Sequence, residues 1–157
     1  MHDFNDLEGL RIAIEMERRG EALYRRAARV SRNREVIEML EALAADEVAH
    51  AAEFSRLYEE ALLRREHASY GDEASAYLSA VAAEIVFPGG LMALREDGFD
   101  DVRAVLDYAI ASEKDSILFY MELARLSTDA AAREVFLNIA EQERGHMRRL
   151  CRQRAEI

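Results

Sequence analysis

Apolar residues recur every three or four positions along four long stretches of the chain, and charged residues fill the positions between them. This period places the apolar side chains on one face of an α-helix, which is typical of amphipathic helices that pack against one another. A helix of 25 residues would be about 38 Å long. The pattern predicts four long helices, at residues 7–30, 35–65, 101–126 and 130–154.

The residues that interrupt helices gather between the second and third of these stretches. Residues 66–100 contain the only proline, Pro88, and four of the seven glycines. Inside this segment, residues 73–87 show the pattern of a shorter amphipathic helix. Two helix pairs with one long link predict an all-α, ferritin-like four-helix bundle with a single crossover that runs the length of the bundle. An up-down bundle with a disordered insertion is the alternative, but the segment is too apolar to favour it.

Composition indicates one globular domain over residues 1–157 and excludes several function classes. Of the residues, 50% are hydrophobic and 33% are charged, which is typical of folded proteins. The net charge of −10 argues against sequence-independent binding to nucleic acids or anionic membranes. No apolar run approaches the roughly 20 residues that span a bilayer, and the acidic N-terminus does not resemble a signal peptide. We therefore expect a cytoplasmic protein with no membrane or nucleic-acid partner.

The first and second halves of the chain match at a constant offset of 96 residues, with no gap. The matched segments are about 7–65 and 101–157, and the crossover 66–100 lies between them. Polar residues match as regularly as apolar ones, which indicates two helical hairpins of one design. The matched polar pairs are Glu17/Glu113, Tyr24/Tyr120, Glu47/Glu143 and His50/His146.

The matched glutamates and histidines lie on or beside the apolar faces of their helices. Glu47 and His50 are three residues apart, which puts both side chains on one helix face. Glu143 and His146 repeat this spacing in the second half. Glu17 and its match in the second half each follow an isoleucine by three residues. The spacing therefore predicts that six titratable groups meet inside the bundle.

Metal ions would resolve the electrostatic cost of this cluster. Four buried carboxylates without a cation would repel one another and lose hydration. Two divalent ions balance four negative charges, and carboxylate with imidazole suits iron or manganese, with zinc as a competitor. Bridging carboxylates would hold the two metals about 3.5–4 Å apart. The alternative, two unrelated surface pairs on charged helices, does not account for the repeat. The predicted ligands are Glu17, Glu47, His50, Glu113, Glu143 and His146.

On these motifs the chain resembles the ferritin-like di-iron carboxylate superfamily and, within it, the rubrerythrin-like ferritin-family proteins. Two Glu-x-x-His motifs, each 30 residues after a glutamate, are far more specific than one. The chain departs from full rubrerythrins because it has no rubredoxin-like Cys₄ domain and because Ser116 stands where they commonly carry an extra glutamate ligand. The resemblance covers nearly the whole chain and rests on residues 13–17 with Tyr24, 46–50, 113–120 and 141–146.

The resemblance implies a catalytic centre with two iron ions per chain. The leading activity would be reduction of H₂O₂, or activation of O₂, with electrons from an external donor protein because this chain offers no second redox centre. A ferroxidase or iron-binding protein would use the same six residues with Fe(II) as its substrate. A non-catalytic metal-binding or partner-binding bundle is the third possibility.

Four residues around the predicted ligands each have two interpretations. By resemblance, Tyr24 and Tyr120 donate hydrogen bonds to the ligand glutamate of the opposite half; otherwise they are core tyrosines with satisfied hydroxyl groups. Asp46 and Gln142 occupy equivalent positions, four residues before each histidine. Either could orient a histidine or be a solvated helix residue.

Two glycines, one cysteine and the crossover complete the sequence-based expectations. Gly20 and Gly145 lie inside predicted helices, where glycine costs about 1 kcal/mol relative to alanine. Close approach of a backbone or substrate, or tight helix packing, would explain them. The single cysteine, Cys151, excludes a disulfide framework, and we expect it to be a small packing residue. Apolar crossover residues favour a homodimer. They are Tyr77, Leu78, Val81, Ile85, Phe87, Leu91 and Met92.

Overall fold

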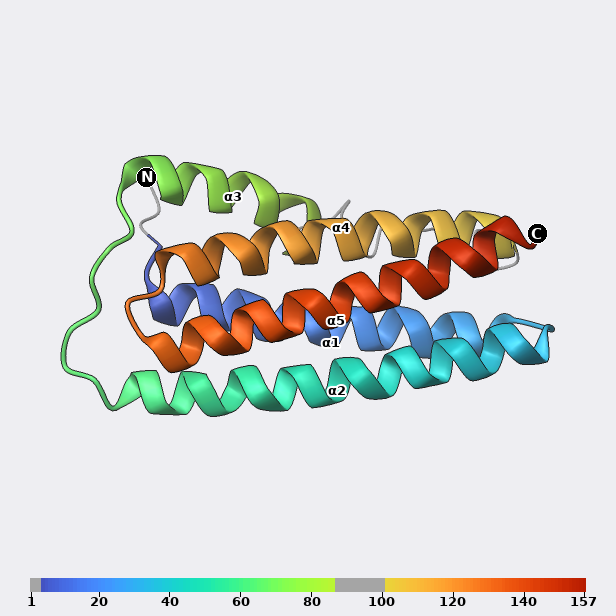
Figure 1. The fold of residues 1–157 in the computed structure, drawn as a ribbon, viewed down its shortest axis with the longest axis horizontal. Coiled ribbons are helices and arrows are strands. Elements are labelled where there is room, and N and C mark those ends of the chain that lie inside the picture. Colours follow the sequence, from blue (N-terminus) through green and yellow to red (C-terminus); the bar gives the residue numbers. More distant parts are fainter. Residues whose placement is uncertain (1–3, 87–100) are drawn as a thin grey trace.

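Five α-helices make up most of the computed structural model, which describes residues 4–86 and 101–157. Four of them are long and lie side by side in a bundle, and the short α3 runs along one end of it (Figure 1). The described residues contain no strand, so the all-α prediction is confirmed. The helices are α1 (Asp6–Val30), α2 (Arg34–Leu62), α3 (Asp72–Val86), α4 (Val102–Leu126) and α5 (Ala130–Ala155).

The bundle consists of two antiparallel hairpins joined by the crossover. Helix α1 packs most extensively against α2, and α4 against α5. Helix α4 starts at the end of the bundle where α2 also starts, so the crossover carries the chain back along the bundle (Figure 1). These two hairpins are the two copies of the 96-residue repeat. None of the described helices has the length and apolarity to cross a lipid bilayer.

Each long helix starts at an Asn or Asp whose side chain accepts a hydrogen bond from a backbone N–H of the first turn. Asp129 caps α5, and its side chain accepts from the Ala131 N–H. Helix α2 ends at Leu62, three residues before the predicted end at 65, and Leu62 is 48% exposed. The helix ends earlier than its apolar pattern predicts, because the chain leaves the bundle there.

The crossover is tied to the start of α1. The backbone N–H of Phe4 donates to Ser75 Oγ (3.0 Å), and the Tyr70 N–H donates to the Phe4 carbonyl (2.8 Å). Leu78 is fully buried within its own chain, whereas Tyr77 is 42% exposed. Of the crossover residues that favour a homodimer, Phe87, Leu91, Met92 and the side chain of Ile85 lie outside the described residues. The homodimer stays a prediction.

Candidate metal centre

The interior of the bundle holds a cluster of six ionisable side chains, which are the six predicted ligands. The four long helices all contribute: α1 and α4 supply one glutamate each, and α2 and α5 supply one glutamate and one histidine each. No member of the cluster is more than 5% exposed. Such burial is rare for charged residues unless they are paired or bind a metal. The members are Glu17, Glu47, His50, Glu113, Glu143 and His146.

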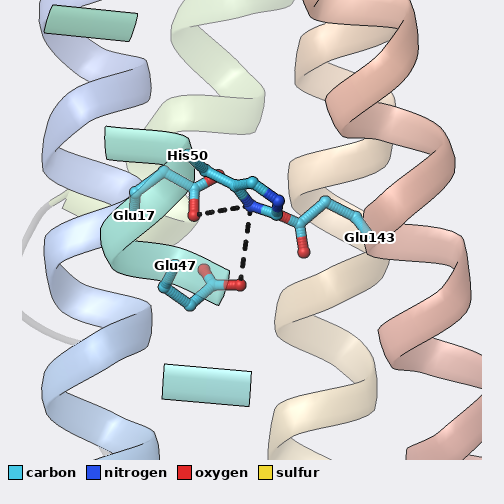
Figure 2. Close-up of side chains that lie close together, drawn as sticks. All are labelled: Glu17, Glu47, His50 and Glu143. Atoms are coloured by element: carbon cyan, nitrogen blue, oxygen red, sulfur yellow. Dashed lines mark hydrogen bonds and ion pairs between the residues drawn. The ribbon is translucent and has the colours of Figure 1, made fainter. Parts of the chain in front are cut away.

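The cluster divides into two overlapping groups that could each hold one metal ion. In each group, one ligand atom from every member lies within 4.8 Å of the others. Figure 2 shows the first group, in which the carboxylates surround the His50 ring. Glu47 and Glu143 belong to both groups, so they are placed to bridge two metals. The groups are Glu17, Glu47, His50 and Glu143, and Glu47, Glu113, Glu143 and His146.

Both histidines turn Nδ1 towards the carboxylates. His50 Nδ1 lies 3.0 Å from Glu143 Oε1 and 3.4 Å from Glu17 Oε2. His146 Nδ1 lies 3.0 Å from Glu143 Oε2 and 3.1 Å from Glu47 Oε1. The two rings are stacked, with centroids 5.6 Å apart. Glu143 therefore faces both histidines, one with each of its oxygens.

Burial and mutual charge shift the pKa values of the cluster strongly. Burial and the charges of neighbouring glutamates raise the pKa of Glu47 and of Glu143 well above the ordinary value. Burial acts to lower the pKa of His50, but the close contacts with Glu143 and Glu17 outweigh it and raise that pKa to about 11. The pKa of His146 rises to about 10 because contacts with Glu113 and Glu143 likewise outweigh burial. In the metal-free protein, bound protons thus offset much of the negative charge of the cluster.

Several ligand atoms in the cluster have no hydrogen-bond partner, although all of them are buried. They face one another at short distances without the geometry of a hydrogen bond. A buried polar atom without a partner costs about 1–3 kcal/mol, and a cation at the centre would satisfy all of them together. Two divalent ions would also balance the four carboxylates. The residues therefore fit a dinuclear metal centre. The orphaned atoms are Glu17 Oε2, Glu47 Oε1, Glu143 Oε2 and His146 Nδ1.

Tyr24 and Tyr120 connect the two hairpins across the cluster. The Tyr120 hydroxyl donates to Glu17 Oε1 (2.7 Å), and the Tyr24 hydroxyl donates to Glu113 Oε1. Both rings are buried. Burial, with the charges of nearby glutamates, raises both tyrosine pKa values well above 10.0, so the hydroxyl groups keep their protons and act as donors. At Glu17 this bond occupies Oε1 and leaves Oε2 for the centre.

Asp46 and Gln142 contact the outer nitrogens of the histidines, and each contacts the histidine of the opposite hairpin. Gln142 Oε1 lies 2.8 Å from His50 Nε2, and Asp46 Oδ2 lies 3.0 Å from His146 Nε2. Both residues thus orient a histidine, one of the two interpretations left open by the sequence. Spacing along one helix could not reveal this pairing, since it depends on how α2 and α5 are aligned.

Of the two interior glycines, only Gly20 is close to the cluster. A Cβ at Gly20 would lie 2.6 Å from Glu47 Oε2, so the glycine makes room for that carboxylate. At Gly145 a Cβ would meet nothing nearer than the Arg148 side chain at 3.9 Å, so neither close approach nor tight packing explains this glycine. Cys151 is exposed, which makes its predicted packing role wrong. It lies on the outer face of α5, one residue after the buried Leu150.

Ser116, the position of the extra glutamate in rubrerythrins, adds no carboxylate to the cluster. Its hydroxyl donates to the Ser112 carbonyl one turn earlier in α4, at 3.2 Å. In the repeat, Ser116 corresponds to Gly20.

Comparison with known proteins agrees with this geometry. The family model described as Rubrerythrin matches residues 8–102 and 104–156. A solved structure from Thermotoga maritima, described as a ferritin-like diiron-carboxylate protein, has a TM-score of 0.72 and 24% identity, and the alignment covers 99% of this chain and 98% of that one. A hypothetical protein from Pyrococcus furiosus has a TM-score of 0.72 and 21% identity over 97% of this chain and 89% of its own. No curated protein matches. The predicted ferritin-like fold is thereby confirmed.

Proposed function

Because the chain belongs to the rubrerythrin family, we propose that it is a dinuclear, di-iron oxidoreductase that reduces H₂O₂, or activates O₂, with electrons from an external donor. The observation that supports this most directly is the pair of overlapping ligand groups that share Glu47 and Glu143. When bound, two ferrous ions would supply the two electrons that, with two protons, reduce one H₂O₂ to two water molecules.

The protein would hold the two ions with its six clustered residues. Glu47 and Glu143 would bridge, because they alone belong to both ligand groups. Glu17 and His50 would complete one position, and Glu113 with His146 the other; this list of ligands is a proposal. Manganese or zinc could take the same ligands, and a zinc-loaded form would be inert in electron transfer.

The surrounding residues would keep the ligands in place and exclude water. Tyr24 and Tyr120 each fix one carboxylate oxygen of a terminal glutamate, so its other oxygen stays directed at the centre. Phe54 packs beside Tyr120, with ring centroids 5.0 Å apart, and Phe136 packs against Phe54 with ring centroids 5.5 Å apart. This apolar layer keeps the tyrosine hydrogen bond dry. An external donor would supply the electrons, since the single cysteine of this sequence cannot form a Cys₄ iron site.

An anaerobic Fe(II) titration of metal-free protein tests the proposal. We expect saturation near two irons per chain, and loss of stoichiometric binding in Glu47→Ala because that residue serves both positions. Glu41→Ala, an exposed glutamate of the same helix, is the matched control and should bind as the wild type does. Failure of the wild type to bind iron would refute the centre. Equal binding by Glu47→Ala would refute its bridging role.

A ferroxidase or iron-binding function is the second candidate, and Ser116 favours it. Because that side chain bonds to its own helix, the proposed ligand set would be a symmetric one of six residues, without an extra carboxylate. Mixing the di-ferrous protein separately with O₂ and with H₂O₂ discriminates the two functions. Much faster oxidation by H₂O₂ supports the peroxidase, whereas turnover of excess Fe(II) by O₂ supports iron oxidation.

A further inference from the structure

The two halves of the candidate centre match in their ligands but differ in the residues behind the histidines. Glutamates, histidines and tyrosines all repeat at the offset of 96 residues. The residues at the equivalent positions Asp46 and Gln142 do not match, because one is a carboxylate and the other an amide. Each contacts the Nε2 of a histidine whose Nδ1 faces the cluster.

The carboxylate and the amide act differently on an imidazole. A carboxylate oxygen only accepts, so Asp46 favours a proton on His146 Nε2, and Nδ1 is then the nitrogen that would lose its proton to bind a metal. A carboxylate partner also makes the imidazole a stronger ligand. Gln142 is uncharged, and its amide can turn to present either a donor or an acceptor to His50 Nε2. It therefore neither fixes the proton of His50 nor strengthens it as a ligand to the same degree.

Other charged groups near Asp46 leave this difference in place. Arg149 is the cation close to Asp46, at 4.0 Å from the same Oδ2 atom, and both side chains are nearly half exposed. A solvated pair at that distance is weak. The 3.0 Å contact with His146 Nε2 is the shorter of the two.

We infer that Asp46 is a positioning residue that makes the two metal positions unequal, so that the position of His146 and Glu113 binds metal more tightly and fills first. The position of His50 and Glu17, which Gln142 supports, fills second. This inference rests on the proposed dinuclear centre. Its consequence is a mixed state, with one position occupied, over a defined range of metal concentration.

Anaerobic titration with Co(II), followed by calorimetry and visible absorption, tests this order. We expect two steps in the wild type. Asp46→Asn should weaken the first step by about tenfold, because loss of such an outer partner weakens metal binding by about 10- to 100-fold and asparagine retains an acceptor. Gln142→Glu should strengthen the second step. Glu41→Gln, which removes one exposed charge from the same helix, should change neither step.

A spectroscopic readout separates a hydrogen bond to His146 from a general loss of negative charge. In Co(II)-loaded protein, each bound histidine gives a paramagnetically shifted NMR signal from its exchangeable Nε2 proton. Asp46→Asn should move one of these two signals, and Gln142→Glu should move the other. The signal that moves in Asp46→Asn should be the one that appears at the first equivalent.

The outcomes separate the inference from the proposed function. No binding of Co(II) by the wild type would overturn both. Two results would overturn the inference and leave the dinuclear centre standing. One is two equivalents bound with Asp46→Asn weakening only the second step, and the other is Asp46→Asn and Glu41→Gln weakening both steps alike. All variants lie at least partly on the surface, so circular dichroism should show the wild-type helix content.

Discussion

The hairpin α1–α2 and the hairpin α4–α5 present the same ligands but support them differently. In the first hairpin, the backbone at Gly20 lies so close to Glu47 that a Cβ would come within 2.6 Å of its carboxylate. In the second, Ser116 occupies the equivalent position and bonds to its own helix. The chemistry of the cluster constrains residues that point inwards. The supporting residues need only hold them there, so the two halves can differ in how they do so.

The sharpest contrast within the cluster is between shared and terminal ligands. Glu143→Ala should abolish binding at both positions, because this side chain faces both histidines. Glu17→Ala should leave one metal per chain, held by the second ligand group. Equilibrium dialysis with Co(II) measures the stoichiometry. Equal losses in the two variants would contradict the division into shared and terminal ligands.

Gly20→Ala should separate stability from metal binding. Alanine favours the helix by about 1 kcal/mol, but its Cβ displaces the Glu47 carboxylate. We expect a folded protein whose activity drops on the order of 100-fold, as follows from misplacing a reacting group by about 1 Å.

Gly145→Ala is the matched control for that substitution, since a Cβ there would meet only the Arg148 side chain, at the ordinary contact distance of 3.9 Å. It should gain about the same stability without loss of activity. Thermal unfolding and single-turnover oxidation measure the two properties. Equal activity in both alanine variants would show that Glu47 tolerates displacement.

The stability of the metal-free protein should fall as pH rises above about 6.5. The pKa values of His50 and His146 are raised to about 11 and about 10, so the folded state keeps protons that the unfolded state releases. This stabilisation is complete below pH 6.5 and is lost as pH rises through the folded values. The slope is at most about 1.4 kcal/mol per pH unit for each histidine.

Metal binding should reverse this dependence. Metals displace the same protons, so Co(II) affinity should increase with pH and binding should release protons. Urea unfolding of metal-free protein at pH 6, 7 and 8, with and without Co(II), measures both signs. His50→Gln should make the slope of the metal-free protein shallower, because it removes one of the groups that hold extra protons in the folded state. A metal-free stability independent of pH would contradict the charged state of the histidines.

The smallest effect is expected from the cross-hairpin tyrosines. Tyr120→Phe removes the donor to Glu17 Oε1 and leaves that buried oxygen unpaired, which should cost about 1–3 kcal/mol of stability. Metal binding should weaken at the position of Glu17 and remain unchanged at the other. Tyr24→Phe should show the mirror result at Glu113. Chemical unfolding and Co(II) titration check both variants.

The bundle could be predicted because its determinants are local. The helical period of apolar residues predicts the ends of the four long helices to within three residues. The repeat selects the six side chains that the structure brings together. That these six bind metal stays a prediction. The packing role predicted for Cys151 is wrong because its side chain lies on the exposed outer face of α5.

The supporting contacts depend on the alignment of distant helices, which the sequence does not encode locally. The partners of Asp46 and Gln142 lie 100 and 92 residues away, on the opposite hairpin. The low helix propensity of glycine marks Gly20 as unusual in the sequence, but its closeness to the Glu47 carboxylate depends on how α1 packs against α2.

The exchange of hydrogen bonds between hairpins bears on how such a centre could have arisen. One hairpin holds three of the six clustered side chains, and its tyrosine and outer polar residue serve the other hairpin. An ancestral hairpin of half this length could therefore have built the centre only as a pair, with the metals astride a twofold axis. Duplication and fusion through the crossover would have released the two copies from that symmetry. Asp46 and Gln142 would then record their divergence.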